Sequence, residues 1–313
     1  MAQAAALTLL IRPVAPFRLD LTVWALRRRA RNAIDRWDGT TYRRVVVIER
    51  RPLEIAVRQS GSPAEPRLIV TAAPPPRTSA GRQHVRSIVD CLFGSRIDLA
   101  EWYRLAERDR RLRILAERFR GVKPPRFPSV FESVVNAFAC QQLSLEVGIQ
   151  LLNRLAAVCD VRRGSAPDVQ YAFPSPRDVA PGRPAKYQAI GFSRQKVRAL
   201  LTLARAIERR DVDLETLPAK DDATVCAELL ALRGVGRWSA EYVMLRGLGR
   251  LHVFPGDDVG AQKRLTRWLG RSGPLDYAGV RKAVAPWRPY AGLVYFHLLL
   301  DGLSDAGVMT SLA

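Results

Sequence analysis

The stretch from Leu232 to Leu265 constrains the fold of this chain more than any other. Residues 234–236 read Gly-Val-Gly and separate two apolar segments with helical spacing. Glycine adopts positive φ and carries no side chain, so the pair permits a tight turn and a close approach to the backbone. The second helix is predicted to begin at Arg237, where free N–H groups attract an anion. The pattern predicts a helical hairpin that can hold a phosphate; a plain turn between helices is the alternative.

An acidic pair follows this hairpin along the chain. Asp257 and Asp258 come directly after Pro255-Gly256 and open a new helical pattern. A carboxylate at a helix start is held anionic by the helix dipole and by backbone donors. An aspartate here is most often only an N-cap. A backbone-gripping hairpin followed by a fixed carboxylate instead indicates an enzyme that acts on the nucleotide it holds, with either aspartate as the active group.

Two aromatic residues begin the helix after the hairpin. Trp238 and Tyr242 are four residues apart and therefore share one helix face. Aromatic faces stack on a nucleobase and attract a cationic one by about 0.5–2 kcal/mol. The pair therefore predicts a pocket for a base extruded from the duplex. The alternative is that both rings are core residues.

Composition limits the class of partner. The chain has 313 residues, 48% of them hydrophobic, which suits one large domain or two. Its formal net charge of +20 favours a polyanionic partner, although a GC-rich genome also produces arginine-rich proteins. The four cysteines are scattered, which predicts reduced thiols and no zinc site. No segment has the length and apolar character of a membrane span or a signal peptide, so we expect a cytoplasmic protein.

The pattern along the chain predicts an α+β fold. The first part mixes strands with helices, and a long basic helix follows at residues 101–120. After the prolines at 124–128 the pattern is helical throughout, beginning with a Ser129-x-x-Glu132 capping box. We therefore divide the chain into an α+β domain, residues 1–115, and an all-α domain, residues 116–313. The expected strands of the first domain are 7–11, 42–49, 53–58 and 68–71, and its expected helices are 21–33 and 83–93.

These motifs resemble one known family. Leu-x-Gly-Val-Gly-x-Trp-x-Ala followed by Pro-Gly-Asp-Asp is similar to the helix-hairpin-helix DNA glycosylases with a Gly/Pro-rich loop and a conserved aspartate, and within them to the bacterial 3-methyladenine DNA glycosylase II family. Gly-Phe-Ser-x-x-Lys at residues 191–196 matches the same family. The resemblance implies an N-terminal antiparallel sheet domain built like half of a TATA-binding protein, followed by an all-α helix-hairpin-helix glycosylase domain. It makes Asp258 the catalytic aspartate and Asp257 its structural partner.

The resemblance also assigns roles to further residues. Gln142 or Leu143 becomes the wedge that fills the gap left by an extruded nucleotide; the alternative is an interhelical turn with a core leucine. Phe296 takes the place of a tryptophan that closes the base pocket in the family, beside Trp238 and Tyr242, and Trp24 is a further candidate wall. The expected DNA-binding residues are Gly234, Val235 and Gly236 of the hairpin with the basic side chains Arg237, Arg246 and Arg264.

The resemblance implies a monofunctional glycosylase that flips and excises alkylated bases such as 3-methyladenine and 7-methylguanine. Bifunctional relatives place a lysine where this chain has Trp238, so no AP-lyase activity is expected. No cysteine follows Cys226, which excludes the iron–sulfur cluster of some relatives. No metal or cofactor is expected, apart from a structural monovalent cation at the hairpin. The expected partner is double-stranded DNA with damaged bases, bound by a monomer in the bacterial cytoplasm at the nucleoid. A glycosylase for deaminated or oxidised bases and a non-catalytic DNA-binding protein remain alternatives.

Overall fold

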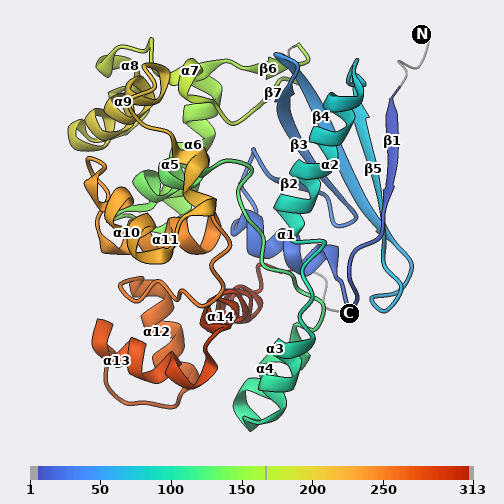
Figure 1. Cartoon of the computed structure of the whole chain (residues 1–313), viewed down its shortest axis with the longest axis vertical. Coiled ribbons are helices and arrows are strands. Elements are labelled where there is room, and N and C mark those ends of the chain that lie inside the picture. Colours follow the sequence, from blue (N-terminus) through green and yellow to red (C-terminus); the bar gives the residue numbers. More distant parts are fainter. Residues whose placement is uncertain (1–5, 166–167, 310–313) are drawn as a thin grey trace.

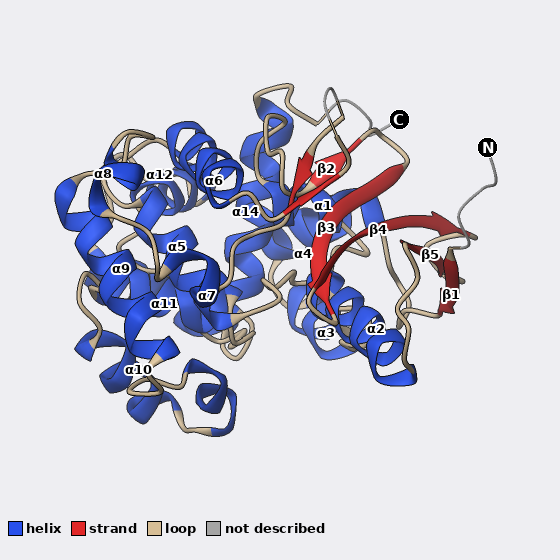
Figure 2. Ribbon diagram, turned by 90° about the horizontal axis from the view of Figure 1, so that it is seen from above, coloured by secondary structure: helices blue, strands red, loops and turns tan. Residues whose placement is uncertain are grey.

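A β-sheet and a set of helices form the two sides of the molecule. The computed structural model describes residues 6–165 and 168–309. The sheet lies at the upper right of Figure 1, and most of the helices lie to its left and below it. Figure 2, seen from above, shows the same division between strands and helices. The α+β class predicted from the sequence is confirmed.

The sheet has five antiparallel strands in the order β1-β5-β4-β3-β2. Alternate residues of the central strand β4, including Leu53, Ile55 and Val57, are buried on one face, as expected for a sheet covered on that face. Helices α1 and α2 supply the apolar side chains that pack there. The elements are β1 (Leu7–Ile11), α1 (Leu19–Arg27), β2 (Arg36–Trp37), β3 (Thr41–Ile48), β4 (Arg51–Ser60), β5 (Arg67–Ala73) and α2 (Ser79–Phe93).

The rest of the described chain is almost entirely helical. Only the short antiparallel pair β6 (Arg162–Arg163) and β7 (Gln170–Tyr171) interrupts it, and it lies against β4. Two short 3₁₀ helices, Leu214–Ala219 and Ala285–Trp287, connect α-helices. The α-helices are α3 (Ala100–Glu107), α4 (Arg110–Arg118), α5 (Val130–Cys140), α6 (Leu145–Cys159), α7 (Pro176–Val179), α8 (Pro184–Gln188), α9 (Arg194–Glu208), α10 (Asp222–Ala231), α11 (Arg237–Arg246), α12 (Val259–Trp268), α13 (Tyr277–Val284) and α14 (Ala291–Asp305).

Two apolar cores organise these helices. One is formed mainly by α5, α6, α9 and α11. The other surrounds α14, whose first ten residues are all buried, and it takes side chains from α1, α3, α4, α12 and α13. Helix α11 contributes residues to both cores, so the hairpin before it and the start of α12 are held between two packed bodies. This arrangement fixes the segments that carry the predicted site.

The expected elements are present, with several local differences. Helix α2 begins at Ser79, four residues before its predicted start, and the two-residue strand β2 was not predicted. Helix α1 ends at Arg27, earlier than predicted, because Arg28 adopts the left-handed conformation with φ of 61°. The predicted basic helix is two helices, since Asp109 caps the second. Ser129 caps α5 as expected, but Glu132 pairs with Arg44 instead of completing the capping box.

The predicted division at residue 115 falls within α4, and it stays a prediction. Within residues 6–165 and 168–309, no helix combines the length and the apolar character that crossing a lipid bilayer requires.

Candidate active site

A cavity of about 970 Å³ lies where the hairpin, the start of α12 and α14 meet. Its remaining walls come from the α5–α6 loop, the start of α9 and the two residues after α1. Basic side chains outnumber acidic ones in the lining, which favours a polyanionic ligand at the mouth. The charged residues in the lining are Arg28, Arg29, Lys196, Arg237, Arg264, Asp257 and Asp258.

The Gly-Val-Gly hairpin connects α10 to α11, as predicted. Gly234 has a φ of 82°, and a Cβ there would lie 2.8 Å from the Cβ of Ala199, so only glycine fits. Gly236 is the N-cap of α11, and a Cβ there would meet no atom within 4 Å. Its open side lies at the start of a helix, where N–H groups are free to bind an anion. The geometry therefore suits the predicted phosphate site, whose role stays a prediction.

Asp258 caps α12 and also lines the cavity. Its Oδ1 accepts a hydrogen bond from the backbone N–H of Ala261 at 2.7 Å. Its Oδ2 accepts from the hydroxyl of Tyr295 at 3.0 Å and from the Trp238 indole N–H at 3.4 Å. The capping role and the site role thus use different oxygens of one carboxylate, so the two interpretations of Asp258 are compatible.

Asp257 is held differently from its neighbour. The guanidinium of Arg237 donates to both its oxygens, at 2.6 and 3.0 Å, and lies 3.7 Å above the ring of Tyr277. This ion pair joins the start of α11 to the start of α12. Both aspartates line the cavity, but Asp257 forms an ion pair with Arg237, whereas Asp258 accepts hydrogen bonds only from neutral groups, two of them aromatic side chains.

The predicted aromatic pair forms one wall. The rings of Trp238 and Tyr242 lie 5.3 Å apart at an angle of 32°. Both line the cavity, although Tyr242 is only 2% exposed. Burial raises the pKa of Tyr242, so its hydroxyl stays protonated at neutral pH.

Two other aromatic residues expected in the pocket lie elsewhere. Phe296 is fully buried and faces the guanidinium of Arg246, with 5.2 Å between ring centroid and Cζ. Its neighbour Tyr295 lines the cavity instead, because consecutive residues of α14 point in different directions. Trp24 belongs to the core around α14 and not to the cavity lining. Burial, and then the charge of Asp258, raise the pKa of Tyr295 well above its ordinary value and keep it a donor.

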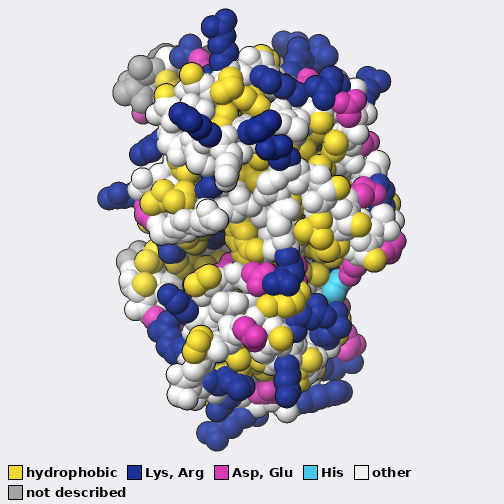
Figure 3. Space-filling view, turned by 90° about the vertical axis from the view of Figure 1, so that its left-hand side faces the viewer, with side chains coloured by type: hydrophobic (Ala, Val, Ile, Leu, Met, Phe, Trp, Pro, Cys, Tyr) yellow, Lys and Arg dark blue, Asp and Glu magenta, His cyan; other side chains and the backbone are white. Residues whose placement is uncertain are grey.

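The predicted DNA-binding arginines separate into two kinds. Arg246 is 1% exposed and donates to the backbone carbonyls of Ala25 and Leu26, so it joins α11 to α1 and is not on the surface. Arg237 and Arg264 line the cavity. Figure 3 shows lysine and arginine side chains spread above and below a hollow that crosses this side of the molecule.

The wedge candidates lie in the loop between α5 and α6. Gln142 is exposed with φ of 55°, and Leu143 is 43% exposed. The preceding residue anchors this loop to the hairpin, because the Gln141 amide donates to the Gly234 carbonyl at 2.8 Å and to the Ser239 hydroxyl at 2.7 Å. Leu143 is therefore an exposed leucine and not a core leucine.

Two carbonyl oxygens of the hairpin are candidates for binding the expected monovalent cation. The Leu232 carbonyl accepts from the N–H of Val235, and the Gly234 carbonyl accepts from Gln141. These two oxygens already have donors, so a monovalent cation is not needed to satisfy them, and it stays a prediction. Among the residues that the structure describes, no group of three or more His, Cys, Asp or Glu side chains is placed to hold a metal ion.

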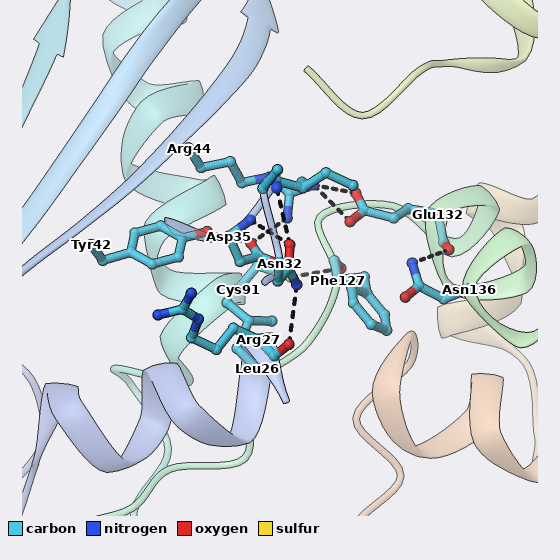
Figure 4. Close-up of polar contacts among 12 residues, drawn as sticks. Leu26, Arg27, Asn32, Asp35, Tyr42, Arg44, Cys91, Phe127, Glu132 and Asn136 are labelled. Carbon is cyan, nitrogen blue, oxygen red and sulfur yellow. Dashed lines mark hydrogen bonds and ion pairs between the residues drawn. The ribbon is translucent and has the colours of Figure 1, made fainter. Parts of the chain in front are cut away.

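A buried polar cluster behind the cavity was not predicted. Arg44 of β3 lies between Asp35, at 2.8 Å, and both carboxylate oxygens of Glu132, at 2.6 Å (Figure 4). All three side chains are at most 5% exposed. The cluster joins the sheet to α5, and no local sequence pattern distinguishes its members from surface charges.

The cluster continues toward the cavity. The amide of Asn136, one turn after Glu132, accepts from Arg28 at 2.6 Å, and Arg28 also donates to the Tyr242 hydroxyl at 2.8 Å. Arg28 and Tyr295 are two polar residues of the cavity lining that the sequence did not indicate as site residues. The early end of α1 brings Arg28 there, and nothing in its basic flanking sequence indicates this.

Comparison with known proteins agrees with this geometry. The family model described as "HhH-GPD superfamily base excision DNA repair protein" matches residues 135–289. The DNA-3-methyladenine glycosylase 2 of Escherichia coli is 27% identical over 178 residues, which cover 57% of this chain and 60% of that protein. This chain therefore matches less than two thirds of that relative's length.

Two solved structures share the fold. A 3-methyladenine DNA-glycosylase from Archaeoglobus fulgidus has a TM-score of 0.82 at 22% identity and covers 97% of this chain and 100% of its own. A Clostridium acetobutylicum 8-oxoguanine glycosylase/lyase in complex with DNA has a TM-score of 0.73 at 15% identity, with 96% of each chain covered. These structures show the shared fold. The family match covers the hairpin, α12 and helices that support them, and with the curated relative it leads to one conclusion: the chain belongs to the HhH-GPD superfamily of base excision DNA repair proteins.

Proposed function

We propose that this protein is a monofunctional DNA glycosylase that excises alkylated bases, of the 3-methyladenine and 7-methylguanine type, from double-stranded DNA. The observation that carries the proposal is the placement of Asp258. Its carboxylate lies in the cavity, fixed by Ala261 and Tyr295, within reach of the Trp238 indole. A carboxylate beside an aromatic wall matches the needs of a reaction that forms a sugar cation next to a stacked base.

The chemistry follows from this arrangement. Cleavage of the bond between C1′ and the base nitrogen passes through an oxocarbenium-like transition state, as in glycoside hydrolysis. The Asp258 carboxylate would stabilise that cation and orient the attacking water. Its donors come from three different helices, so its position does not depend on the substrate. Such preorganisation means that little rearrangement is required when charge develops.

DNA binding would use the hairpin and the wedge loop together. Phosphate contacts at Gly234 and Gly236 would position the duplex without reading its sequence. Leu143 would enter the base stack, and the extruded base would occupy the cavity. Because Gln141 joins the wedge loop to the hairpin, one rigid unit would hold the backbone and fill the gap. The solved DNA complex of a structural relative supports DNA as the partner.

The absence of lyase activity is also part of the proposal. Lys196 lines the cavity, but its ammonium donates to the carbonyls of Ala139 at 3.2 Å and Gln141 at 2.7 Å. These two contacts hold the Lys196 ammonium at the C-terminal end of α5, so it is not directed at Asp258. Position 238 is tryptophan. Borohydride trapping of a covalent DNA complex would reveal a lyase nucleophile, and we expect none.

The experiment that tests the proposal is base release from methylated duplex DNA by wild type and Asp258→Asn. Asparagine is a good N-cap, so α12 should persist while the negative charge is lost. We expect release to fall by at least about 100-fold, with DNA affinity changed by no more than a few-fold. Asp276→Asn is the matched control, because Asp276 caps α13 through Gly279 in the same way outside the cavity.

Each outcome has a definite meaning. Loss of release in Asp258→Asn alone supports a catalytic role. Equal activity in both variants would refute it. DNA binding without release of alkylated, deaminated or oxidised bases by the wild type would favour a non-catalytic DNA-binding protein.

A further inference from the structure

A chain of hydrogen bonds with Arg28 at its centre lies behind the aromatic wall. The Asn136 Nδ2 amide donates to the Glu132 backbone carbonyl at 3.0 Å. This contact turns the Asn136 oxygen toward Arg28, which donates to it at 2.6 Å. The second Nη atom of Arg28 donates to the Tyr242 hydroxyl at 2.8 Å. The Glu132 carbonyl therefore orients Asn136, and Arg28 sets the polarity of the chain because it donates at both of its contacts.

This polarity determines what Tyr242 can offer a ligand. A guanidinium has five N–H donors and no acceptor, so the Tyr242 oxygen must present a lone pair to Arg28. A phenolic hydroxyl has one hydrogen, which must then point away from Arg28. Among the described residues, the structure gives this hydrogen no acceptor. Arg28 and Tyr242 are 4% and 2% exposed, and both line the cavity.

A second buried cation strengthens the effect. The Arg246 guanidinium lies 5.8 Å from the centroid of the Tyr242 ring, on the side of the core. Its Nη1 and Nε atoms are buried without a hydrogen-bond partner among the described residues. Two fixed positive charges beside the ring favour partial negative charge in front of it. Burial keeps Tyr242 a neutral donor.

We infer that Arg28 and Tyr242 select bases by the substituent that faces this wall: an exocyclic carbonyl oxygen is accepted and an exocyclic amino group is disfavoured. The inference rests on the proposed function and narrows its substrate class. 6-Oxopurines, such as 7-methylguanine and hypoxanthine, accept the hydrogen of Tyr242. 6-Aminopurines, such as 3-methyladenine, present a donor to a donor and leave both unpaired, which is costly in a buried site.

The test compares two bases in one substrate. Methylated duplex DNA contains 7-methylguanine and 3-methyladenine, which both carry a positive charge but differ at C6. The measured quantity is the ratio of their enzyme-dependent release rates, after subtraction of spontaneous depurination. Tyr242→Phe keeps the stacking ring and removes the hydroxyl. We expect the ratio of 7-methylguanine to 3-methyladenine to fall about tenfold, as for the loss of one buried hydrogen bond.

A second variant and a control keep the test decisive. Arg28→Met frees the Tyr242 hydroxyl to rotate, so the ratio should fall in the same direction, and this variant replaces Tyr242→Phe if the latter does not fold. Tyr103→Phe removes a hydroxyl that contacts Gly121 far from the cavity, and it should leave the ratio unchanged. Release of hypoxanthine, a neutral 6-oxopurine, from an oligonucleotide should fall with that of 7-methylguanine.

Failure of this inference differs from failure of the proposed function. An unchanged ratio in Tyr242→Phe, whether neither rate changes or both fall equally, would overturn the selection by Tyr242. The glycosylase proposal would remain intact. A wild type that releases neither methylated purine nor hypoxanthine would overturn both.

Discussion

Replacing Arg44 by methionine tests whether the buried cluster joins the sheet to α5 energetically. Arg44 donates to both oxygens of Glu132, whose side chain is 5% exposed and has no other side-chain donor in the described structure. In the variant, Asp35 still accepts hydrogen bonds from the Tyr42 hydroxyl, at 2.7 Å, and from the Asn32 amide. The substitution therefore leaves one buried carboxylate without a partner, and breaking such a pair costs about 3–5 kcal/mol.

The cost should depend on pH in a defined direction. Burial already raises the pKa of Glu132 against the opposing effect of Arg44, and removal of Arg44 raises it further. The folded variant then binds a proton that the unfolded chain, with a pKa of about 4.3, releases. The penalty is therefore full above the folded pKa and disappears as the pH falls toward the unfolded value, by about 1.4 kcal/mol per pH unit.

Urea unfolding followed by tryptophan fluorescence at pH 5.5, 7 and 8.5 measures this difference between Arg44→Met and wild type. Subtraction at each pH removes the contributions of other groups. The double variant Arg44→Met with Glu132→Met should recover most of the loss, because both partners are then apolar. A penalty below about 1 kcal/mol, or one that does not change with pH, would refute the reasoning.

Four other predictions concern ionisation, the hairpin and the wedge. Burial lowers the pKa of His297 to about 4, so the folded protein keeps it neutral while the unfolded chain protonates near pH 6.5. Stability from this group is present above pH 6.5 and falls by about 3 kcal/mol toward pH 4; His297→Phe should remove that loss in unfolding curves, and an unchanged pH slope would contradict it. Gly234→Ala should lower the free energy of unfolding by about 1–2 kcal/mol, because of its positive φ and a side-chain clash at 2.8 Å. Gly236→Ala should keep stability but weaken DNA binding measured by fluorescence anisotropy, and wild-type affinity would exclude a phosphate there. Leu143→Ala should reduce affinity for duplex with an abasic-site analogue about tenfold, whereas Leu10→Ala, at a leucine that is 51% exposed against 43% for Leu143, should not. Equal effects would remove the wedge role.

Local patterns in the sequence were sufficient for the elements that carry the chemistry. The glycines of the hairpin, the caps at Ser129 and Asp258 and the period of the strands act over a few residues, and the structure has each of them. The positions of Trp238 and Tyr242 followed from helical spacing alone. These features are set by backbone conformation, which neighbouring residues determine.

Placement of side chains between distant segments could not be obtained in this way. Whether Tyr295 or Phe296 faces the cavity depends on the rotation of α14, which is buried on all sides and has no amphipathic pattern to fix it. Arg246 was predicted to bind DNA, and its burial could not be foreseen because its carbonyl partners lie more than 200 residues away in the chain. Arg28 enters the cavity only because α1 stops early. Such contacts depend on tertiary packing, which no short sequence window records.

The position of Glu132 predicts which property of the protein is affected first when the contact between the sheet and the helices weakens. Its side chain binds the sheet through Arg44, while its backbone carbonyl orients Asn136, which accepts from Arg28, the donor to the Tyr242 hydroxyl. Asp258 receives its own donors from α11, α12 and α14, none of which belongs to the sheet. Under the proposed function, loosening of the sheet would therefore disturb the choice of base before it disturbs bond cleavage. The accuracy of base selection would then be an early measure of how firmly the two halves of the molecule are joined.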